Sequence, residues 1–472
     1  MGNEVFSNLC SASLIKETAL VPVIPNVFFY LNDEDLAADY GGVDGNYIAG
    51  NRSEAQKSIK KALPAPVGTI NIDVEPATFG HFLNGVCGGF ASGAYLPITA
   101  PSGAFTVGET VHDSTPVTPI TGVVAFDGGD YLLITGASGD FLTGGTLTGE
   151  TSSKTATITR FDAAVYGHAQ NLPVTLDETY TLQFNYVNNA IRFYNVRFTG
   201  FDAVGMSDNK ITCGVKCMCG GQFRHAKVMA QLTAGSGAKS ITVDQTSGLK
   251  AAGGDTIKVF RPSTGVFLDF ASTGVKTHTT GTISTETAIP ITNLETQLEV
   301  GDLIVLAPQT ATYSTSDVFI WQGGSTVTIG ATLATLATAY IEEFSIVLNN
   351  EFEERWSAGG SDIVDRFPTT ILQKQFRSTG SIKAYYQDEG FVRNARLDSD
   401  QAMRWKTEGG LISTSAEKYT LRFDFSKIHY EPFETNMKSG EIINQEINWK
   451  GFYSETDGRE ARALLINATA SY

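Results

Sequence analysis

The sequence predicts a mainly β protein, an antiparallel β-sandwich or barrel with one short helix. Three observations support this fold class. Gly is frequent, with 48 among 472 residues, and Thr and Val recur along the chain, a composition that favours strands joined by tight turns. Long runs rich in Leu, Ala, Glu and Lys, which favour helices, are scarce. Several segments alternate apolar and polar residues with a period of two, the pattern of a half-buried strand.

The one predicted helix follows a predicted strand. Apolar and polar residues alternate over residues 69–74, and Glu75-Pro76 ends that strand. Thr78 stands at the N-cap position and Gly88 at the position after the C-terminus. We therefore expect a short helix over about 78–87. Its apolar stripe has the i, i+3, i+4, i+7 spacing and consists of Phe79, Phe82, Leu83 and Val86.

Two Gly/Thr-rich stretches interrupt the regular strand pattern, and each contains an internal echo. In the first, residues 102–110 resemble residues 138–146. In the second, residues 240–257 resemble residues 290–304. Two copies indicate a small duplicated β-module and not a solenoid. The predicted division is an N-terminal arm and first part of the main β-domain (1–98), an inserted module (99–161), the main domain continued (162–227), a second inserted module (228–308) and the main domain completed (309–472).

The charge and the N-terminus restrict the class of protein. The formal net charge is −16 and the pI about 4.9, whereas a protein that grips nucleic acid usually presents a basic face. Met1–Phe6 lacks the basic and apolar regions of a signal peptide, and no apolar run approaches the ~20 residues that span a bilayer. We expect folding in a cytoplasm, five Cys as thiols and no membrane partner.

The order of these segments resembles the tail-tube protein family of long-tailed bacteriophages. The resemblance covers roughly residues 1–98, 162–227 and 309–472, by order and pattern and without an invariant motif. The segment around Phe105 is itself similar to a module common in phage structural proteins. The residues that carry the family resemblance are Ile15–Thr18, Asn51–Ser53, Gly68–Ile72, Phe79–Gly88, Phe344–Asn350, Ser378–Ile382, Glu441–Ile447 and Asn467.

The resemblance implies a β-sandwich subunit of tail-tube type that forms hexameric rings, stacked helically around a DNA-conducting lumen. It implies other tail proteins as partners: the tape measure, the terminator and the baseplate. Double-stranded DNA would pass during genome ejection without specific binding, and the acidic chain suits a wall along which phosphates slide. The protein would be made in the host cytoplasm and reside in the virion. The inserted modules should project outward, because an inward insertion would obstruct the lumen.

A cysteine cluster is the main candidate for a metal site. Cys213, Cys217 and Cys219, with His225, could bind zinc tetrahedrally. However, the three Cys share the strand parity of Ile211 and Val215, and the cluster lacks the CxxC knuckle of structural zinc sites. Buried free Cys is a common small core residue. We therefore expect core thiols and no metal, cofactor-binding or catalytic residue.

Two further functions stay open from the residues alone. The acidic cluster Glu351, Glu353 and Glu354 could do acid/base chemistry on glycans, as in a tail-borne depolymerase, but a solvated strand end is the simpler interpretation. Asp255 and Asp302 each follow Gly and fit turns better than calcium sites. The chain could also be another virion part, such as a tail terminator, a head decoration or a baseplate hub. No local nucleophile or phosphate-loop motif favours an enzyme.

Overall fold

The computed structural model describes most of the chain. The described residues are 10–18, 20–36, 43–47, 55–59, 65–116, 118–207, 209–230, 232–233, 240–250, 253–267, 273–279, 282–285, 297–355, 370–385, 390–413, 415–433 and 444–472. Asn51–Ser53 and Glu441–Ile443 of the family resemblance, and residues 290–292 of the second echo, therefore lie outside the described part. The mainly β prediction is confirmed: nearly every element is a strand, and all the strand pairs described are antiparallel.

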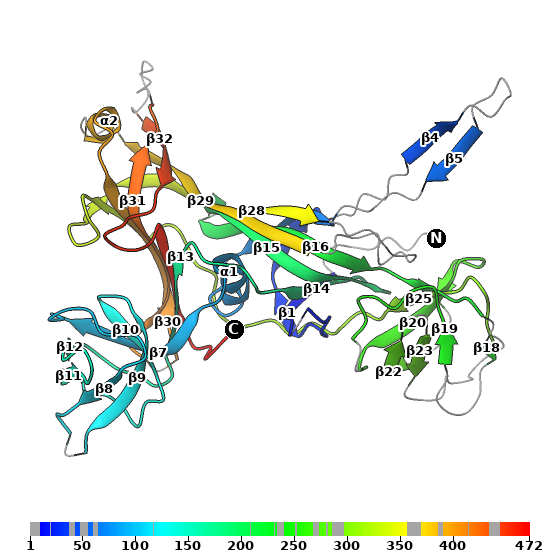
Figure 1. Cartoon of the computed structure of the whole chain (residues 1–472), viewed down its shortest axis with the longest axis horizontal. Helices are drawn as coiled ribbons and strands as arrows, with labels where there is room; N and C mark the ends of the chain where they lie inside the picture. The colour runs from blue at the N-terminus through cyan, green and yellow to red at the C-terminus, as the bar shows by residue number, and fades with distance from the viewer. Residues whose placement is uncertain are drawn as a thin grey trace.

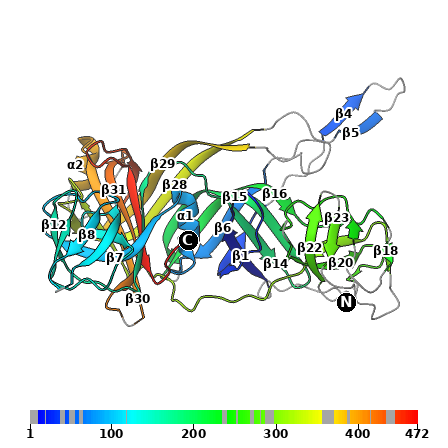
Figure 2. The same ribbon diagram turned by 60° about the horizontal axis from the view of Figure 1, so that its bottom comes forward.

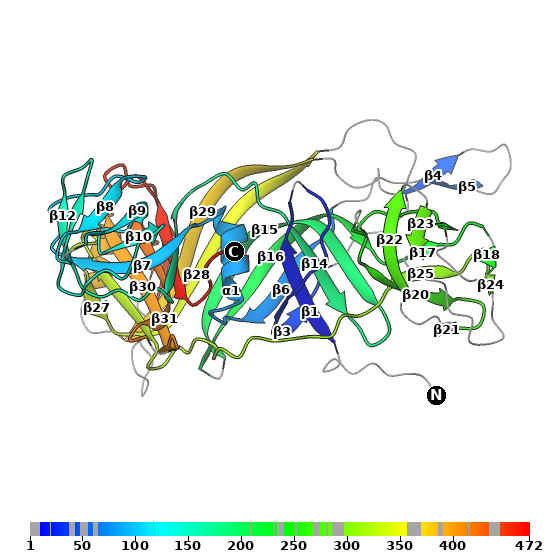
Figure 3. The same ribbon diagram turned by 90° about the horizontal axis from the view of Figure 1, so that it is seen from below.

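A closed barrel forms the centre of the molecule (Figure 3). Around it, β2 pairs with β1, β1 with β14, β14 with β15, β15 with β16, β16 with β6 and β6 with β3. Only Tyr30 separates β2 from β3, so this one segment joins the two ends of the sheet and closes it. The strands are β1 (Ser11–Lys16), β2 (Val27–Phe29), β3 (Leu31–Glu34), β6 (Val67–Asp73), β14 (Tyr180–Asn185), β15 (Ala190–Ser207) and β16 (Lys210–Phe223).

The predicted helix is α1 (Phe79–Cys87), and it packs on this barrel. Phe82 meets Phe29 and Phe198 at ring-centroid distances of 5.0 and 5.3 Å, and burial of such a ring contributes about 2 to 3 kcal/mol. Gly88 ends the helix with φ 78°, a left-handed conformation that glycine adopts without strain. Thr78 occupies the N-cap position, but its hydroxyl donates to Glu75 Oε2 (2.9 Å) and caps no backbone N–H.

A second sheet continues from the barrel through β28, which pairs with the distal half of β15. Its order is β28–β29–β32–β31–β30–β26–β27, and β31 also pairs with β33, which leads to β13 and β7. These strands are β7 (Ala91–Thr99), β13 (Tyr166–Leu172), β26 (Ser325–Gly330), β27 (Ala337–Ala339), β28 (Ile341–Arg355), β29 (Thr370–Tyr385), β30 (Gln401–Leu411), β31 (Lys418–Tyr430), β32 (Asn444–Gly451) and β33 (Ala461–Asn467).

One apolar core runs through both sheets and includes α1, Trp405 and Trp449. A second helix, α2 (Gly390–Arg396), was not expected, and the prediction of a single helix was incomplete. It has seven residues and none is fully buried, so it leaves no apolar stripe in the sequence. Its Phe391 ring packs on Tyr430 at 5.6 Å. No helix among the described residues has the length and apolarity to cross a membrane.

Residues 91–158 form a closed barrel of their own (Figure 1, cyan). The ring order is β7–β10–β9–β8–β11–β12 and back to β7, around a separate apolar cluster that includes Phe105 and Phe141. Strands β7 to β9 and β10 to β12 occupy equivalent places in this ring, which matches the sequence echo. The additional strands are β8 (Thr110–Asp113), β9 (Ile120–Asp127), β10 (Tyr131–Thr135), β11 (Thr146–Gly149) and β12 (Thr155–Ile158).

A second closed barrel lies at the opposite end of the molecule (Figures 1 and 2, right). Its ring order is β17–β25–β20–β22–β23–β19, closed by the Val228–Val243 bridge, and it too has its own apolar cluster. The strands are β17 (Ala226–Lys227), β19 (Ser240–Thr242), β20 (Thr256–Arg261), β22 (Thr273–Thr279), β23 (Thr282–Thr285) and β25 (Leu303–Leu306). Short pairs elsewhere are β4 (Val43–Tyr47) with β5 (Ala55–Ile59), β18 (Leu232–Thr233) with β24 (Gln297–Leu298), and β21 (Val266–Phe267) with β20.

The two closed barrels have the same ring topology, offset by one strand. When β12 is matched to β17, and β7 to β11 are matched in order to β19, β20, β22, β23 and β25, every described neighbour in one ring is a neighbour in the other. The inserted segments are therefore circular permutants of one β-barrel design. This relation is invisible in the sequence, because it lies in non-local strand pairing.

A shared turn precedes the matched strands β8, β11, β20 and β25. Each turn contains a glycine with positive φ, namely Gly108, Gly144, Gly254 and Gly301. A carboxylate then accepts a backbone N–H near the start of the turn: Glu109 from Thr106 (2.6 Å), Asp255 from Lys250 (2.6 Å) and Asp302 from Glu299 (2.8 Å). At Gly145, which lacks a side chain, Asp113 of β8 supplies the acceptor for Leu142 (3.1 Å).

Candidate functional site

The feature that stands out in the second sheet is a long hairpin, β28 with β29, whose distal part leaves the body of the sheet. Near its base, β28 pairs with β15 over residues 345–349, and β29 pairs with β32 over residues 379–385. Farther out, residues 350–355 pair only with residues 370–376 among the described strands. We call this distal part the ribbon. Its two outer backbone edges face no other described strand.

The base of the ribbon is held tightly. Gly380 of β29 lies so close to β28 that an added Cβ would overlap the Ser345 carbonyl oxygen and lie 2.5 Å from the Trp449 ring. Ser345 and Ser381 share a hydroxyl–hydroxyl hydrogen bond of 2.8 Å across the same pair of strands. Only glycine permits this approach, so Gly380 allows the two strands to pack closely at the base of the ribbon.

Charged side chains of opposite sign line the ribbon. Glu353 pairs with Arg355 and with Lys374, both at 2.7 Å, and Glu351 pairs with Arg377 at 3.0 Å. The two ion pairs of Glu353 lower the pKa of its carboxyl, first through the hydrogen bond from Lys374. Exposed charges of this kind are a common way to prevent indiscriminate pairing of a strand edge. Glu351 and Glu353 are thus held by cations, and the side chain of Glu354 lies outside the described part.

A loop segment, residues 173–177, runs along one side of the ribbon. The Gln373 amide accepts the Leu176 N–H (2.8 Å) and donates to the Val174 carbonyl (3.0 Å). Arg197 of β15 donates to the Leu176 carbonyl (2.7 Å). The ribbon and this segment border an open groove, in which Leu372 remains about half exposed. The groove therefore combines apolar surface with an unpaired strand edge, as a protein contact requires.

The cysteine cluster lies in the core. Cys213, Cys217 and Cys219 of β16 are all buried, and they alternate with more exposed residues on the same strand. Burial raises the pKa of all three thiols, which disfavours the thiolate that a metal would need. His225 lies on the exposed segment after β16. Among the described residues, no group of three His, Cys, Asp or Glu side chains has the geometry to hold a metal ion.

Two carboxylates singled out in the sequence turn out to hold buried arginines. Asp255 accepts from Arg192 of the central barrel (2.8 Å), and Asp302 accepts from Arg261 at 2.9 and 3.0 Å. These arginine partners lie 63 and 41 positions away along the chain, so no local pattern predicts them.

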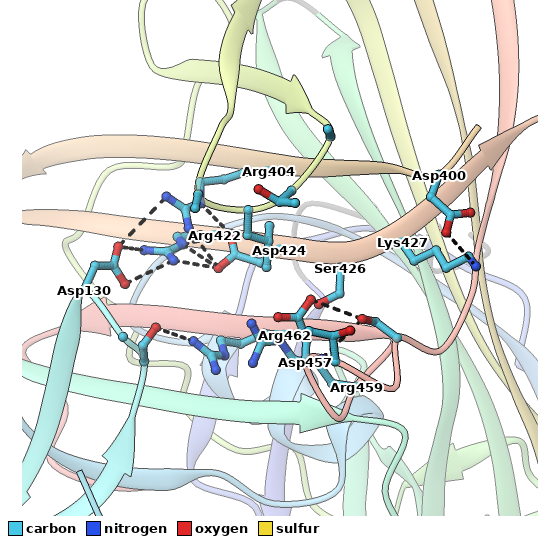
Figure 4. Close-up of a pocket in the computed structure, with 18 residues that line it drawn as sticks. Asp130, Asp400, Arg404, Arg422, Asp424, Ser426, Lys427, Asp457, Arg459 and Arg462 are labelled. Carbon is cyan, nitrogen blue, oxygen red and sulfur yellow. Dashed lines mark hydrogen bonds and ion pairs between the residues drawn. The ribbon is translucent and has the colours of Figure 1, made fainter. Parts of the chain in front are cut away.

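Sequence reasoning also missed a polar cluster under the second sheet (Figure 4). Arg422 and Asp424 of β31 pair at 2.6 Å, Arg404 of β30 joins Asp424 at 2.6 Å, and Asp130 of the β9–β10 turn pairs with Arg422 at 2.7 Å. Burial raises the pKa of the Asp424 carboxyl, but the attraction of Arg422 and Arg404 outweighs it and lowers that pKa to about 2. The alternation of β31 was visible in the sequence; the burial of its polar face was not.

Comparison with known proteins adds little to this picture. No protein-family model and no curated protein matches the sequence. Among solved structures, the chain is similar to one described as the crystal structure of an Hcp protein, with 8% sequence identity and a TM-score of 0.16. That likeness covers 29% of this chain and 96% of the other. At this TM-score it supports no conclusion about fold or function, so the functional proposal must rest on the geometry described above.

Proposed function

We propose that this chain is a structural virion protein, the tail-tube subunit of a long-tailed phage, that polymerises as stacked hexameric rings around a lumen for DNA. The observation that carries the proposal is the ribbon of β28 and β29, which extends a sheet beyond its core with both outer edges unpaired in the described residues. Sheet edges of this length tend to be covered or paired with another chain. A second copy of the same chain is the simplest partner.

The rest of the fold suits a repeating wall. Both inserted segments are closed barrels, and closure removes their strand edges. Strand pairing between copies would therefore involve the strand edges of the central sheets. A head-to-tail contact between different surfaces of identical copies produces a ring when its rotation closes. The five-part division of the chain made from the sequence belongs to this proposal, with the central sheets as the wall and the barrels as outward decorations.

The charge fits a conduit better than a nucleic-acid binding protein. With a net charge of −16, the average field repels phosphates, so DNA could pass without adhering. The role is structural and not catalytic, with the tape measure, terminator and baseplate proteins as further partners. The protein would be made in the host cytoplasm and then incorporated into the virion.

Electron microscopy of the purified protein at rising concentration tests the proposal. Long hollow tubes with six-fold rings are the expected result. Isolated rings or trimers would instead favour a terminator, decoration or hub protein, and cleavage of host polysaccharide would favour a depolymerase. A compact species that stays monomeric at high concentration would contradict the proposal.

A pair of leucine variants tests the part played by the ribbon. Leu372 is 46% exposed on the ribbon and Leu397 is 68% exposed after α2, so both accept a lysine without disturbing the core. We expect Leu372→Lys to raise the concentration needed for assembly at least about tenfold, since it places a charge in a contact that assembly buries. Leu397→Lys should assemble like the wild type, and both should unfold at the wild-type temperature. Unaltered assembly of Leu372→Lys would exclude the ribbon as the contact.

A further inference from the structure

A cavity beneath the second sheet is lined by more cationic than anionic side chains. It has a volume of about 620 Å³ and lies where the β9–β10 turn, β30, β31 and the β32–β33 connection meet (Figure 4). Five cationic and four carboxylate side chains line it. The lining thus carries one positive charge in excess, in a chain whose net charge is −16.

Three of the five cations are neutralised by carboxylates. Arg404 and Arg422 share Asp424 and Asp130 at distances of 2.6 to 3.9 Å, a balanced group of two cations and two anions. Lys427 pairs with Asp400 at 2.8 Å. These three side chains therefore have little need of a further anion.

The other two cations, Arg459 and Arg462, have no such partner. Arg462 is 5% exposed, and it donates only to neutral acceptors: the Asn171 side-chain oxygen (2.9 Å) and the Gly128 carbonyl (2.6 Å). The Nε of Arg459 is buried without a hydrogen-bond acceptor. Among the described residues, no carboxylate lies within salt-bridge distance of either guanidinium, and Asp457, the remaining carboxylate of the cavity, interacts with Ser454 at 3.3 Å.

The burial of these guanidinium groups has an energetic cost. A buried guanidinium without a counter-charge destabilises a fold, and arginine cannot relieve the cost by losing its proton. Burial lowers the pKa of the Arg459 side chain, and repulsion from Arg462 lowers it further, whereas Asp457 and Asp424, which form no salt bridge with it, raise it only in part. Two guanidiniums side by side match the several oxygen acceptors of one oxyanion, which each can bind through two N–H groups.

We propose that Arg459 and Arg462 form a binding site for an oxyanion with several free oxygen acceptors. Two sources supply this chemistry: the carboxylate of an acidic side chain from a second copy of the chain, or a free inorganic anion such as phosphate. Only the first source rests on the assembly proposed above. The hydroxyl group of Thr456 at the same cavity would add a neutral donor to the anion.

The test compares Arg459→Gln with Arg396→Gln. Arg459 is only partly buried, so its substitution should leave the fold intact, and Arg396 of α2 is an exposed arginine whose loss changes the net charge equally. Thermal unfolding of dilute wild-type protein is measured at pH 7 while chloride is replaced by inorganic phosphate at constant ionic strength. If the site takes free anions, the wild type and Arg396→Gln gain several degrees, and Arg459→Gln loses at least half of the gain.

A second measurement distinguishes the carboxylate of another copy. Assembly of the same three proteins is followed by sedimentation in the absence of phosphate. A rise of at least about tenfold in the assembly concentration of Arg459→Gln alone supports the carboxylate source, even when phosphate has no effect. The proposal is overturned if phosphate stabilises all three proteins equally or none, and Arg459→Gln assembles like the wild type. If the wild type does not assemble, the proposed function fails, and the phosphate measurement alone then decides whether the site exists.

Discussion

Removal of the Asp255 carboxylate should selectively destabilise the second closed barrel. Asp255 and Arg192 are both almost fully buried, and their side chains meet at 2.8 Å across the junction between that barrel and the central one. Asp255 also accepts the Lys250 N–H at 2.6 Å. Asp255→Ala deletes both hydrogen bonds and leaves the Arg192 charge buried. Each hydrogen bond to a charged group contributes about 1.5 to 3 kcal/mol, so we expect a loss of about 3 to 5 kcal/mol.

Limited proteolysis can measure this loss of stability for the second closed barrel alone, whereas a single unfolding temperature reports on all the barrels and sheets of the chain together. Cleavage within strands β20 and β25 requires local opening of that barrel, and 4 kcal/mol raises the open population about a thousandfold. Cleavage within residues 91–158 should keep its wild-type rate. The matched control is Arg192→Met with Asp255→Val, which removes both charges and should recover most of the stability. A loss of less than about 1 kcal/mol for Asp255→Ala, or a double variant that opens as readily as the single one, would contradict this role of the ion pair.

Three further predictions address other parts of the fold. Burial lowers the pKa of His81 and of His168 to about 4, below the unfolded value near 6.5. The free energy of unfolding should therefore be highest above pH 6.5 and fall as the pH decreases towards 4, by up to about 3 kcal/mol for each histidine. Chemical denaturation at a series of pH values measures this decrease. The pKa of Asp424 is lowered to about 2, so protonation of this carboxyl should reduce the free energy of unfolding by a further ~2 kcal/mol as the pH falls from 4 to 2. This step should be absent from the pH profile of Asp424→Asn. Gly85→Ala would press a methyl group into Phe198 and should lower stability by about 1 to 3 kcal/mol in urea titrations, whereas Gly129→Ala, at positive φ but in open space, tests the backbone strain alone.

The local elements of the fold could be predicted from the sequence because their signals are local. The spacing of Phe79, Phe82, Leu83 and Val86 placed α1 correctly, and the parity of Cys213, Cys217 and Cys219 with Ile211 is reflected in their common burial. The seven-residue α2 has no buried face and therefore left no periodic signal. Thr78 was correctly placed at the N-cap, but Glu75 competes for its hydroxyl.

The candidate sites depended on contacts that no local pattern contains. Asp130 and Arg422 lie 292 positions apart, and Arg462 reaches Gly128 over 334 positions. Alternation along β31 separates an aromatic face from a polar face that carries Arg422 and Asp424. It cannot show that the inserted barrel covers the polar face, because this depends on how two distant segments pack. Functional residues of this kind become visible only when buried charges and their partners are counted in three dimensions.

The permuted topology of the two inserted barrels explains how they can be accommodated without disturbing the sheets between them. In a closed ring, adjacent antiparallel strands offer an entry and an exit that lie side by side. The first barrel is entered through β7 and left through β12, which pair with each other, and the second is entered through β17 and left through β25, which also pair. The same ring of strands can thus have its chain ends at either of two neighbouring positions. In both cases the two ends lie side by side where the barrel joins the rest of the chain. Because both insertions close on themselves, they add surface to the chain without pairing with strand edges such as those of the β28–β29 ribbon.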